Sequence, residues 1–122
     1  MESRGLENHD KNPRIIRALE QSFYEEGLEI TVEVLGDELI VECSGIQTFR
    51  IALNGGELVI DYIENDGTSP GAGRKAVDAL KKFGEEYGYD VRASGVLPDA
   101  IEFWDDAGFV KDGKDYIYKN QD

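Results

Sequence analysis

Hydrophobic residues change their spacing along the chain, and these changes mark the expected elements. A helical spacing covers residues 13–26, where Asn12 and Pro13 are typical of a helix start and Gly27 of its end. An alternation of apolar and polar residues then predicts strands in four runs, at residues 28–35, 38–43, 48–53 and 57–64. Because short turns separate these runs, we expect an antiparallel meander.

The rest of the chain alternates helices and strands. Residues 71–87 have one apolar and one charged face, which predicts an amphipathic helix. Further elements are expected as a strand at 89–94, a short helix from 98 to about 107, and strands at 109–111 and 116–119. Because a helix links the strands at 57–64 and 89–94, those two strands should run parallel. The predicted fold class is α+β, a mostly antiparallel sheet with one parallel strand pair and helices on both faces.

A length of 122 residues fits one domain. Residues 1–11 show no apolar period and are predicted to be a disordered tail, which leaves a single domain over residues 12–122. His9 is the only histidine and lies in that tail, so no metal site is expected. Cys43 is the only cysteine, and we interpret it as a small buried strand residue rather than a nucleophile.

The chain is strongly acidic, with 26 Asp and Glu against 13 Lys and Arg and a net charge of -13. The excess is spread along the chain without a basic stripe, so nucleic acid is not an expected partner. No apolar run is long enough for a bilayer and no leader opens the chain, which favours a cytoplasmic protein without a membrane partner. The acidity indicates either a well-solvated surface or a salt-rich cytoplasm.

The segment 67–74 joins a predicted strand to a predicted helix start. Gly71 and Gly73 would let the backbone approach a ligand closely, and the first helical amides carry the positive end of the helix dipole. Arg74 and Lys75 add positive charge in an acidic chain. These features predict an anion site. A plain turn whose glycines serve only geometry is the alternative.

The segment 57–109 resembles the core of the GNAT acetyltransferase superfamily. Members of the family have a strand ending in an apolar residue, a loop of the form Arg/Gln-x-x-Gly-x-Gly/Ala, and then a helix. Ile63 takes the place of the strand-end residue, and residues 68–73, TSPGAG, take the place of the loop. A later family motif, an Ala four residues before a Tyr that is followed by three residues and Gly-Phe, is matched in position from Ala100 to Phe109.

This resemblance implies a GNAT-like fold that uses acetyl-CoA as a co-substrate and transfers its acetyl group to an amine, either a small molecule or a protein. The pantetheine would lie where the strand at 57–64 splays from the strand at 89–94. Asp61 is a candidate general base, and an ordinary solvated residue is the alternative. The implied cofactor-binding residues are Ile63, Thr68, Ser69, Gly71, Ala72, Gly73, Arg74 and Lys75.

The chain departs from the family at several of these places. Thr68 stands where Arg or Gln is usual, Pro70 has no amide hydrogen, and Leu97 replaces a common Asn. Trp104 holds the position of a Tyr that often protonates the CoA thiolate, and an indole is a donor but not a usable acid. Three functions therefore stay open: a small N-acetyltransferase, a catalytically inactive GNAT-like ligand-binding or protein-interaction module, and a generic α+β domain without a CoA site.

Overall fold

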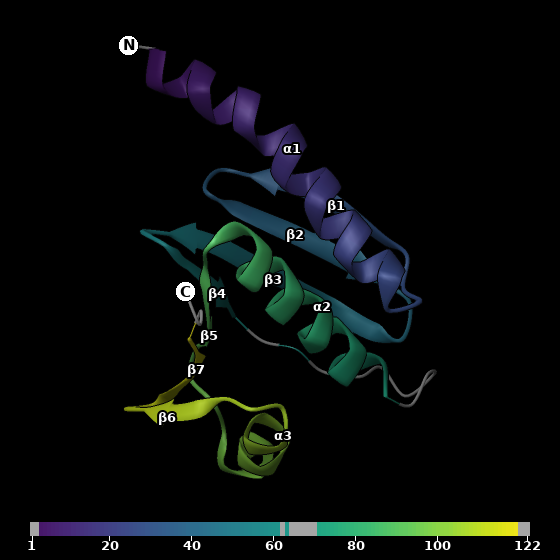
Figure 1. Cartoon of the computed structure of the whole chain (residues 1–122), viewed down its shortest axis with the longest axis vertical. Coiled ribbons are helices and arrows are strands. Elements are labelled where there is room, and N and C mark those ends of the chain that lie inside the picture. The colour runs from purple at the N-terminus through teal and green to yellow at the C-terminus, as the bar shows by residue number, and fades with distance from the viewer. Residues whose placement is uncertain (1–2, 62, 64–70, 120–122) are drawn as a thin grey trace.

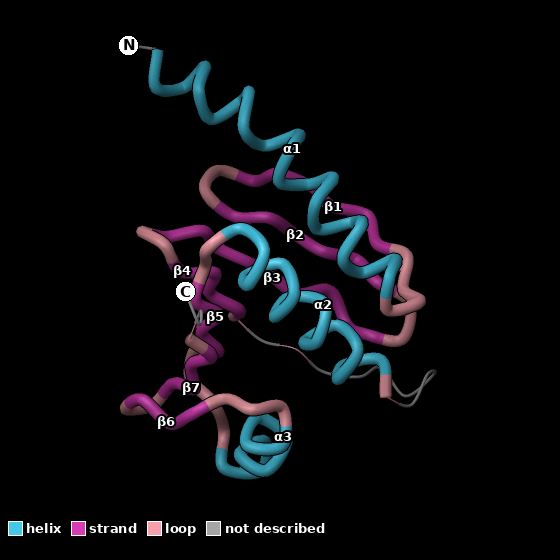
Figure 2. The backbone as a smooth tube through the Cα atoms, viewed as in Figure 1, coloured by secondary structure: helices cyan, strands magenta, loops and turns pink. Residues whose placement is uncertain are grey.

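The computed structural model describes residues 3–61, 63 and 71–119. The elements follow the expected order (Figures 1 and 2), with boundaries within a few residues of those predicted everywhere except at the first helix and the fourth strand. They are α1 (Ser3–Glu25), β1 (Ile30–Leu35), β2 (Glu38–Cys43), β3 (Ile46–Asn54), β4 (Glu57–Ile60), α2 (Ala72–Tyr87), β5 (Asp90–Ala93), the 3-10 turn η1 (Pro98–Ala100), α3 (Ile101–Asp106), β6 (Val110–Asp112) and β7 (Asp115–Tyr118).

The strands of the described residues form one seven-stranded sheet in the order β1-β2-β3-β4-β5-β7-β6. Every neighbouring pair is antiparallel except β4 and β5, which run parallel because α2 carries the chain back between them. The predicted α+β class, with a mostly antiparallel sheet and one parallel pair, is therefore confirmed.

Within the described residues, all three α-helices lie over one face of the sheet. Leu39, Ile51 and Ile60 are in register across β2, β3 and β4 and belong to the same buried cluster as α1 and α2, which run side by side in Figure 1. Trp104 of α3 joins that cluster. The expectation of helices on both faces is wrong here. Outward positions of the meander such as Glu42 and Arg50 are instead charged and exposed, so that face needs no cover.

The first helix begins at Ser3 rather than at Pro13, so residues 3–11, predicted as a disordered tail, are helical in the structure. A proline inside a helix removes one backbone hydrogen bond but does not oblige the helix to end. The sequence predicted a start at Pro13 because proline is frequent at the first helical position. That preference is only statistical, and this helix does not follow it. The N-terminal half of α1 extends beyond the sheet (Figure 1).

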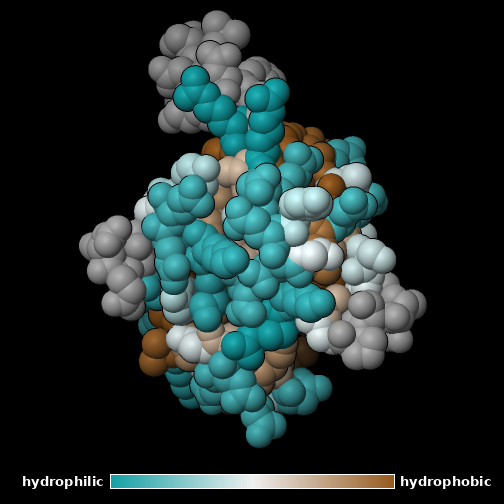
Figure 3. Space-filling model, turned by 45° about the vertical axis from the view of Figure 1, so that its right-hand side comes forward, coloured by the Kyte–Doolittle hydropathy of each residue, from teal (hydrophilic) through white to brown (hydrophobic). Residues whose placement is uncertain are grey.

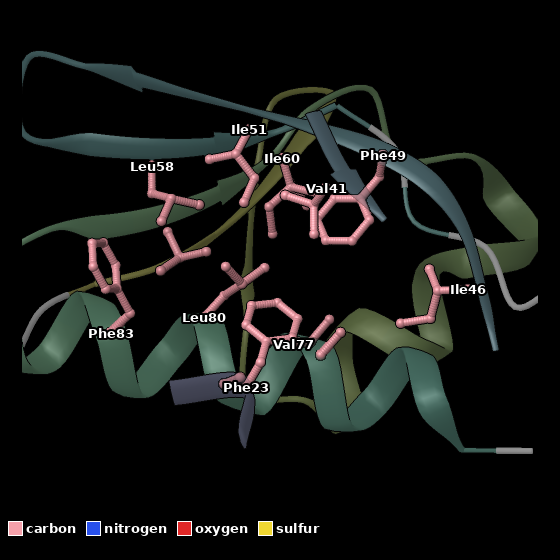
Figure 4. Close-up of a cluster of buried hydrophobic side chains, with 14 of the residues drawn as sticks. Phe23, Val41, Ile46, Phe49, Ile51, Leu58, Ile60, Val77, Leu80 and Phe83 are labelled. Carbon is pink, nitrogen blue, oxygen red and sulfur yellow. The ribbon is translucent and has the colours of Figure 1, made fainter. Parts of the chain in front are cut away.

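The core lies between the sheet and α2, as Figure 4 shows. Ile51, Leu58 and Ile60 point from the strands toward side chains on α2, and all of them are almost completely buried. Leu80 and Phe83 contribute the facing side chains from α2. Each such side chain stabilises the fold by about 1.5–3 kcal/mol through burial. The helix is thereby fixed along β4 and β5, which determines where its first residue lies.

We expect Gly84→Ala to destabilise the protein, although alanine is the better helix former by ~1 kcal/mol. A Cβ at Gly84 would lie 2.6 Å from the Tyr89 carbonyl oxygen and 3.0 Å from Val91 Cγ2. Overpacking of this kind costs about 1–3 kcal/mol. Urea denaturation should show the loss, with Glu86→Ala on the exposed side of α2 as the control that changes stability by less than about 0.5 kcal/mol. A Gly84→Ala protein as stable as the parent would contradict this packing.

Candidate functional site

The parallel strands β4 and β5 separate abruptly at their carboxyl ends. Their pairing runs from Glu57 opposite Asp90 to Ile60 opposite Ala93, and the Ser94 amide still donates to the Ile60 carbonyl at 3.0 Å. The Gly95 amide faces β7, as strand alternation requires, and donates to Asp115 at 2.9 Å. The Val96 amide, which alternation would direct at β4, donates instead to the Lys114 carbonyl in the turn before β7. β4 ends at Ile60, whereas the sequence predicted a strand that continues to residue 64; residues 62 and 64 lie outside the described residues.

A cavity of about 210 Å³ lies where the two strands part. Its wall is mainly apolar, and Trp104, which is only 5 % exposed, forms part of it. The apolar lining consists of Ile60, Ile63, Ala93, Val96, Leu97, Ala100 and Trp104. Its polar side chains are Asp61, Ser94 and Asp99. A mostly apolar lining with a few polar groups is the usual composition of a ligand site, and at this volume the cavity is smaller than the roughly 300–1,000 Å³ typical of such sites.

Helix α2 begins toward the same end of the sheet. Since β5 starts opposite Glu57 at the amino end of β4, α2 must run back along the pair, and its first residue, Ala72, lies toward the carboxyl ends of both strands (Figure 1). Gly71 adopts the left-handed conformation with φ 82°, and no side chain among the described residues caps the helix. The first amides of a helix lack acceptors within it, so this end can attract an anion.

Not every group predicted at this helix start is available. The Lys75 amide donates to the Gly71 carbonyl at 3.1 Å, so it already closes the first helical turn. Gly73 is buried and has a partner of its own. Arg74 is exposed, and its Nε donates to Asp78 Oδ1 at 3.2 Å, which leaves the rest of its guanidinium for another anion. Thr68 and Ser69 lie outside the described residues.

The structure brings together residues that the sequence analysis had named separately. Asp61, the candidate base, and Ile63 share the cavity with Leu97 and Trp104, two positions where the chain departs from the GNAT pattern. Asp61 is exposed, and its amide donates to the Arg50 carbonyl at 3.1 Å, which fixes the backbone from which its carboxylate projects.

Sequence reasoning missed the far wall of the cavity. The segment 94–97 leaves β5 at Gly95, which has φ +61°. A glycine directly after a predicted strand was a signal of a change in chain direction, but its hydrogen-bond partner could not be read from the sequence. Asp99, in the 3-10 turn η1, was also missed, because exposed acidic residues are common throughout so acidic a chain.

A network of charged side chains on the opposite face of the sheet connects β4, β5, β6 and β7. Arg92 donates from Nε and Nη2 to the two oxygens of Glu57, at 3.1 and 3.0 Å, and from Nη1 to Asp115 at 3.1 Å. Asp112 also pairs with Nη1, at 2.9 Å. These hydrogen bonds, that of Glu57 first, raise the pKa of Arg92 further above its already high value. Sequence reasoning missed this network as well, since its members lie far apart along the chain.

A larger groove of about 700 Å³ lies between α1 and the edge strand β1. Arg17, Tyr24, Glu29 and Glu42 are among its lining residues, and three of its lining side chains are glutamates. Among the described elements, no helix start or strand divergence adjoins it. The side of the molecule in Figure 3 is mostly hydrophilic, with smaller hydrophobic patches between the polar residues and toward the edges of the view. We therefore place the candidate site at the cavity between β4 and β5.

Comparisons with known proteins bear on the fold. The chain is similar to the crystal structure of the anti-CRISPR protein AcrVA5, with a TM-score of 0.56 and 22 % identity over 67 % of this chain and 98 % of that one. At this identity the likeness shows a shared fold and nothing about activity. No protein-family model and no curated protein matches the chain.

Metal-binding clusters and membrane-spanning helices are both absent from the described part of the chain. Over residues 3–61, 63 and 71–119, no group of three or more His, Cys, Asp or Glu side chains is arranged to hold a metal ion. Within the same ranges, no helix has the length and apolar character that crossing a membrane requires.

Cys43 lies away from the cavity, on β2, and burial raises the pKa of its thiol. Because the thiolate is the reactive form, we expect iodoacetamide at pH 8 to modify native Cys43 at least about tenfold more slowly than the urea-unfolded chain. Mass spectrometry of timed samples measures both rates. Equal rates would show that the thiol is accessible and contradict its structural role.

Proposed function

We propose that the protein binds acetyl-CoA between the ends of β4 and β5 and acts as a small GNAT-like N-acetyltransferase. The observation that carries the proposal is the divergence of the one parallel strand pair around a cavity, toward the end of the sheet where helix α2 begins. In α/β sheets, ligands commonly bind beyond the carboxyl ends of parallel strands. The resemblance of residues 57–109 to the GNAT core supports the same site.

The residues present fit such a ligand in three ways. Gly71 has open space around it, because a Cβ placed there would meet nothing within 4 Å, so a pyrophosphate could approach the helix start. Arg74 offers the nitrogens that do not contact Asp78. Beyond Ser94 the chain after β5 no longer bonds to β4, so a pantetheine could lie between the two strand ends, where Ile63 and Val96 would contact its carbon chain.

Acetyl-CoA supplies an activated thioester, and the chain would contribute acid–base groups around it. Asp61 is the carboxylate in the cavity nearest in sequence to the strand end, and its role would be to accept a proton from the attacking amine, directly or through water. Trp104 lines the cavity where the family often has its acid. Its indole can donate a hydrogen bond but cannot act as a proton donor at neutral pH, so water would protonate the departing thiolate.

The second candidate function is a GNAT-like binding module without catalysis. The specific observation in its favour is again Trp104, because a buried indole occupies the place of the acid. Both candidates need the CoA site. They differ only in whether acetyl transfer follows binding.

Gly71→Asp should weaken CoA binding about tenfold more than Gly71→Asn. Both side chains have the same shape and suffer the same strain at φ 82°, but only aspartate places a negative charge beside the pyrophosphate. Two charge pairs of ~1 kcal/mol each in water correspond to roughly a tenfold or larger difference in affinity. Isothermal titration of each folded variant with CoA measures it. Equal affinities for the two variants would place the phosphates elsewhere.

Acetyl transfer is expected to depend on Asp61. With a panel of alkyl amines, release of the CoA thiol should be slower in Asp61→Asn by about 10²-fold or more, while the Kd for CoA stays within about twofold. Asp99→Asn is the matched control, because it changes the other aspartate of the cavity. Equal thiol release by Asp61→Asn and the parent would remove Asp61 from the mechanism. CoA binding without any thiol release by the parent would favour the non-catalytic module.

A further inference from the structure

We infer that Asp115 is the positioning residue that creates the cavity, by capturing the Gly95 amide and turning the chain after β5 away from β4. The carboxylate lies on β7, and its Oδ1 accepts the Gly95 N–H at 2.9 Å. This inference rests on the proposed function for the identity of the ligand. We call Asp115, Gly95 and the hydrogen bond between them the latch. The latch concerns how the chain folds and does not depend on the identity of the ligand.

The directions of the Ser94 and Val96 amides show the turn. Along a strand, neighbouring N–H groups point alternately to the two sides, so Ser94 and Val96 should both face β4. The Ser94 amide does so, donating to Ile60. The Val96 amide instead donates to the Lys114 carbonyl at 2.9 Å, on the side of β7. The chain after β5 has therefore turned away from β4 between these two residues.

Gly95 is the residue that permits the flip. Its φ of +61° lies in the left-handed region, which residues with a side chain rarely adopt. A Cβ at Gly95 would meet nothing within 4 Å, so a substitution there acts through backbone conformation and not through a clash. The glycine makes the flipped conformation accessible, and the bond to Asp115 selects it.

Arg92 holds the latch in place. Its Nη1 donates to Asp115 Oδ2 at 3.1 Å, so the two oxygens of one carboxylate connect the guanidinium to the Gly95 amide. Glu57 on β4 binds the other edge of the guanidinium. Arg92 is about one-fifth exposed, with a side-chain exposure of 21 %. Through Glu57 the network connects β4 to β5 where the two strands pair. Through Asp115 it holds Gly95, at the point where the chain turns away from β4.

Asp112 provides the matched control. It pairs with the same Nη1 of Arg92, at 2.9 Å, but it lies on β6, and the Gly95 amide is bonded to Asp115 rather than to it. Removing either carboxylate deprives the same guanidinium of one negatively charged partner. Only the removal of Asp115 releases Gly95.

The test compares Asp115→Ala, Asp115→Asn and Asp112→Ala in the full chain. We expect Asp115→Ala to weaken CoA binding at least tenfold by isothermal titration, while Asp112→Ala stays within about twofold. Asp115→Asn should stay within about threefold, because its amide oxygen can still accept the Gly95 N–H. Equal losses in Asp115→Ala and Asp112→Ala, or a tenfold loss in Asp115→Asn, would overturn the inference.

Amide hydrogen exchange measured by NMR tests the latch without any ligand. Exchange at Gly95 and Val96 should accelerate at least tenfold in Asp115→Ala and not in Asp112→Ala; equal rates would overturn the inference. If the parent chain does not bind CoA, the proposed function fails and this experiment still decides on the latch. If Asp115→Ala does not fold, Gly95→Ala replaces it: we expect faster exchange at Val96, and an unchanged rate would contradict the inference.

Discussion

The short parallel ladder between β4 and β5 is the constraint on which the rest of the fold depends. Two adjacent parallel strands cannot be joined by a hairpin, so the chain needs a crossover, and α2 provides it. The apolar face of α2 then covers the sheet through Leu80 and Phe83. The same geometry directs the start of the helix toward the end of the sheet at which the ladder stops and the cavity opens.

An anionic ligand must bind here against the field of a protein with a net charge of -13. At the helix start, Arg74 pairs with Asp78 through its Nε, which offsets part of its charge, and Lys75 is exposed. In the proposed site these cations would act together with the backbone amides and the helix dipole, which act over a few ångströms. Screening limits the repulsion from distant carboxylates to about 8 Å at physiological ionic strength.

Most of the secondary structure could be predicted because its signals are local. The alternation in residues 38–43 and the turn glycines indicated the meander, and the helical period of residues 71–87 indicated α2 almost to its ends. The helix start and Asp61 were also named from the sequence. The side of the sheet on which each helix lies was predicted wrongly, because the helical period of a segment does not indicate which face of the sheet it covers.

The parts of the site that escaped prediction depend on contacts between distant residues. Beyond Ser94 the chain turns away from β4, because the Gly95 and Val96 amides bond to acceptors on Asp115 of β7 and on Lys114 in the turn before it. No residue near Ile63 in the sequence indicates these contacts, so the predicted strand continued to residue 64. The role of Arg92 is hidden for the same reason, because its carboxylate partners come from three other strands.

A titration of the isotopically labelled protein with acetyl-CoA, followed by amide and indole chemical shifts, tests the central claim most directly. Two separate groups of resonances should shift together with one affinity: the start of α2, from Gly71 to Lys75, and the cavity wall, from Gly95 to Leu97 with the Trp104 indole. Shifts confined to the groove between α1 and β1, or at only one of the two groups, would contradict a single site formed by the helix start and the strand divergence.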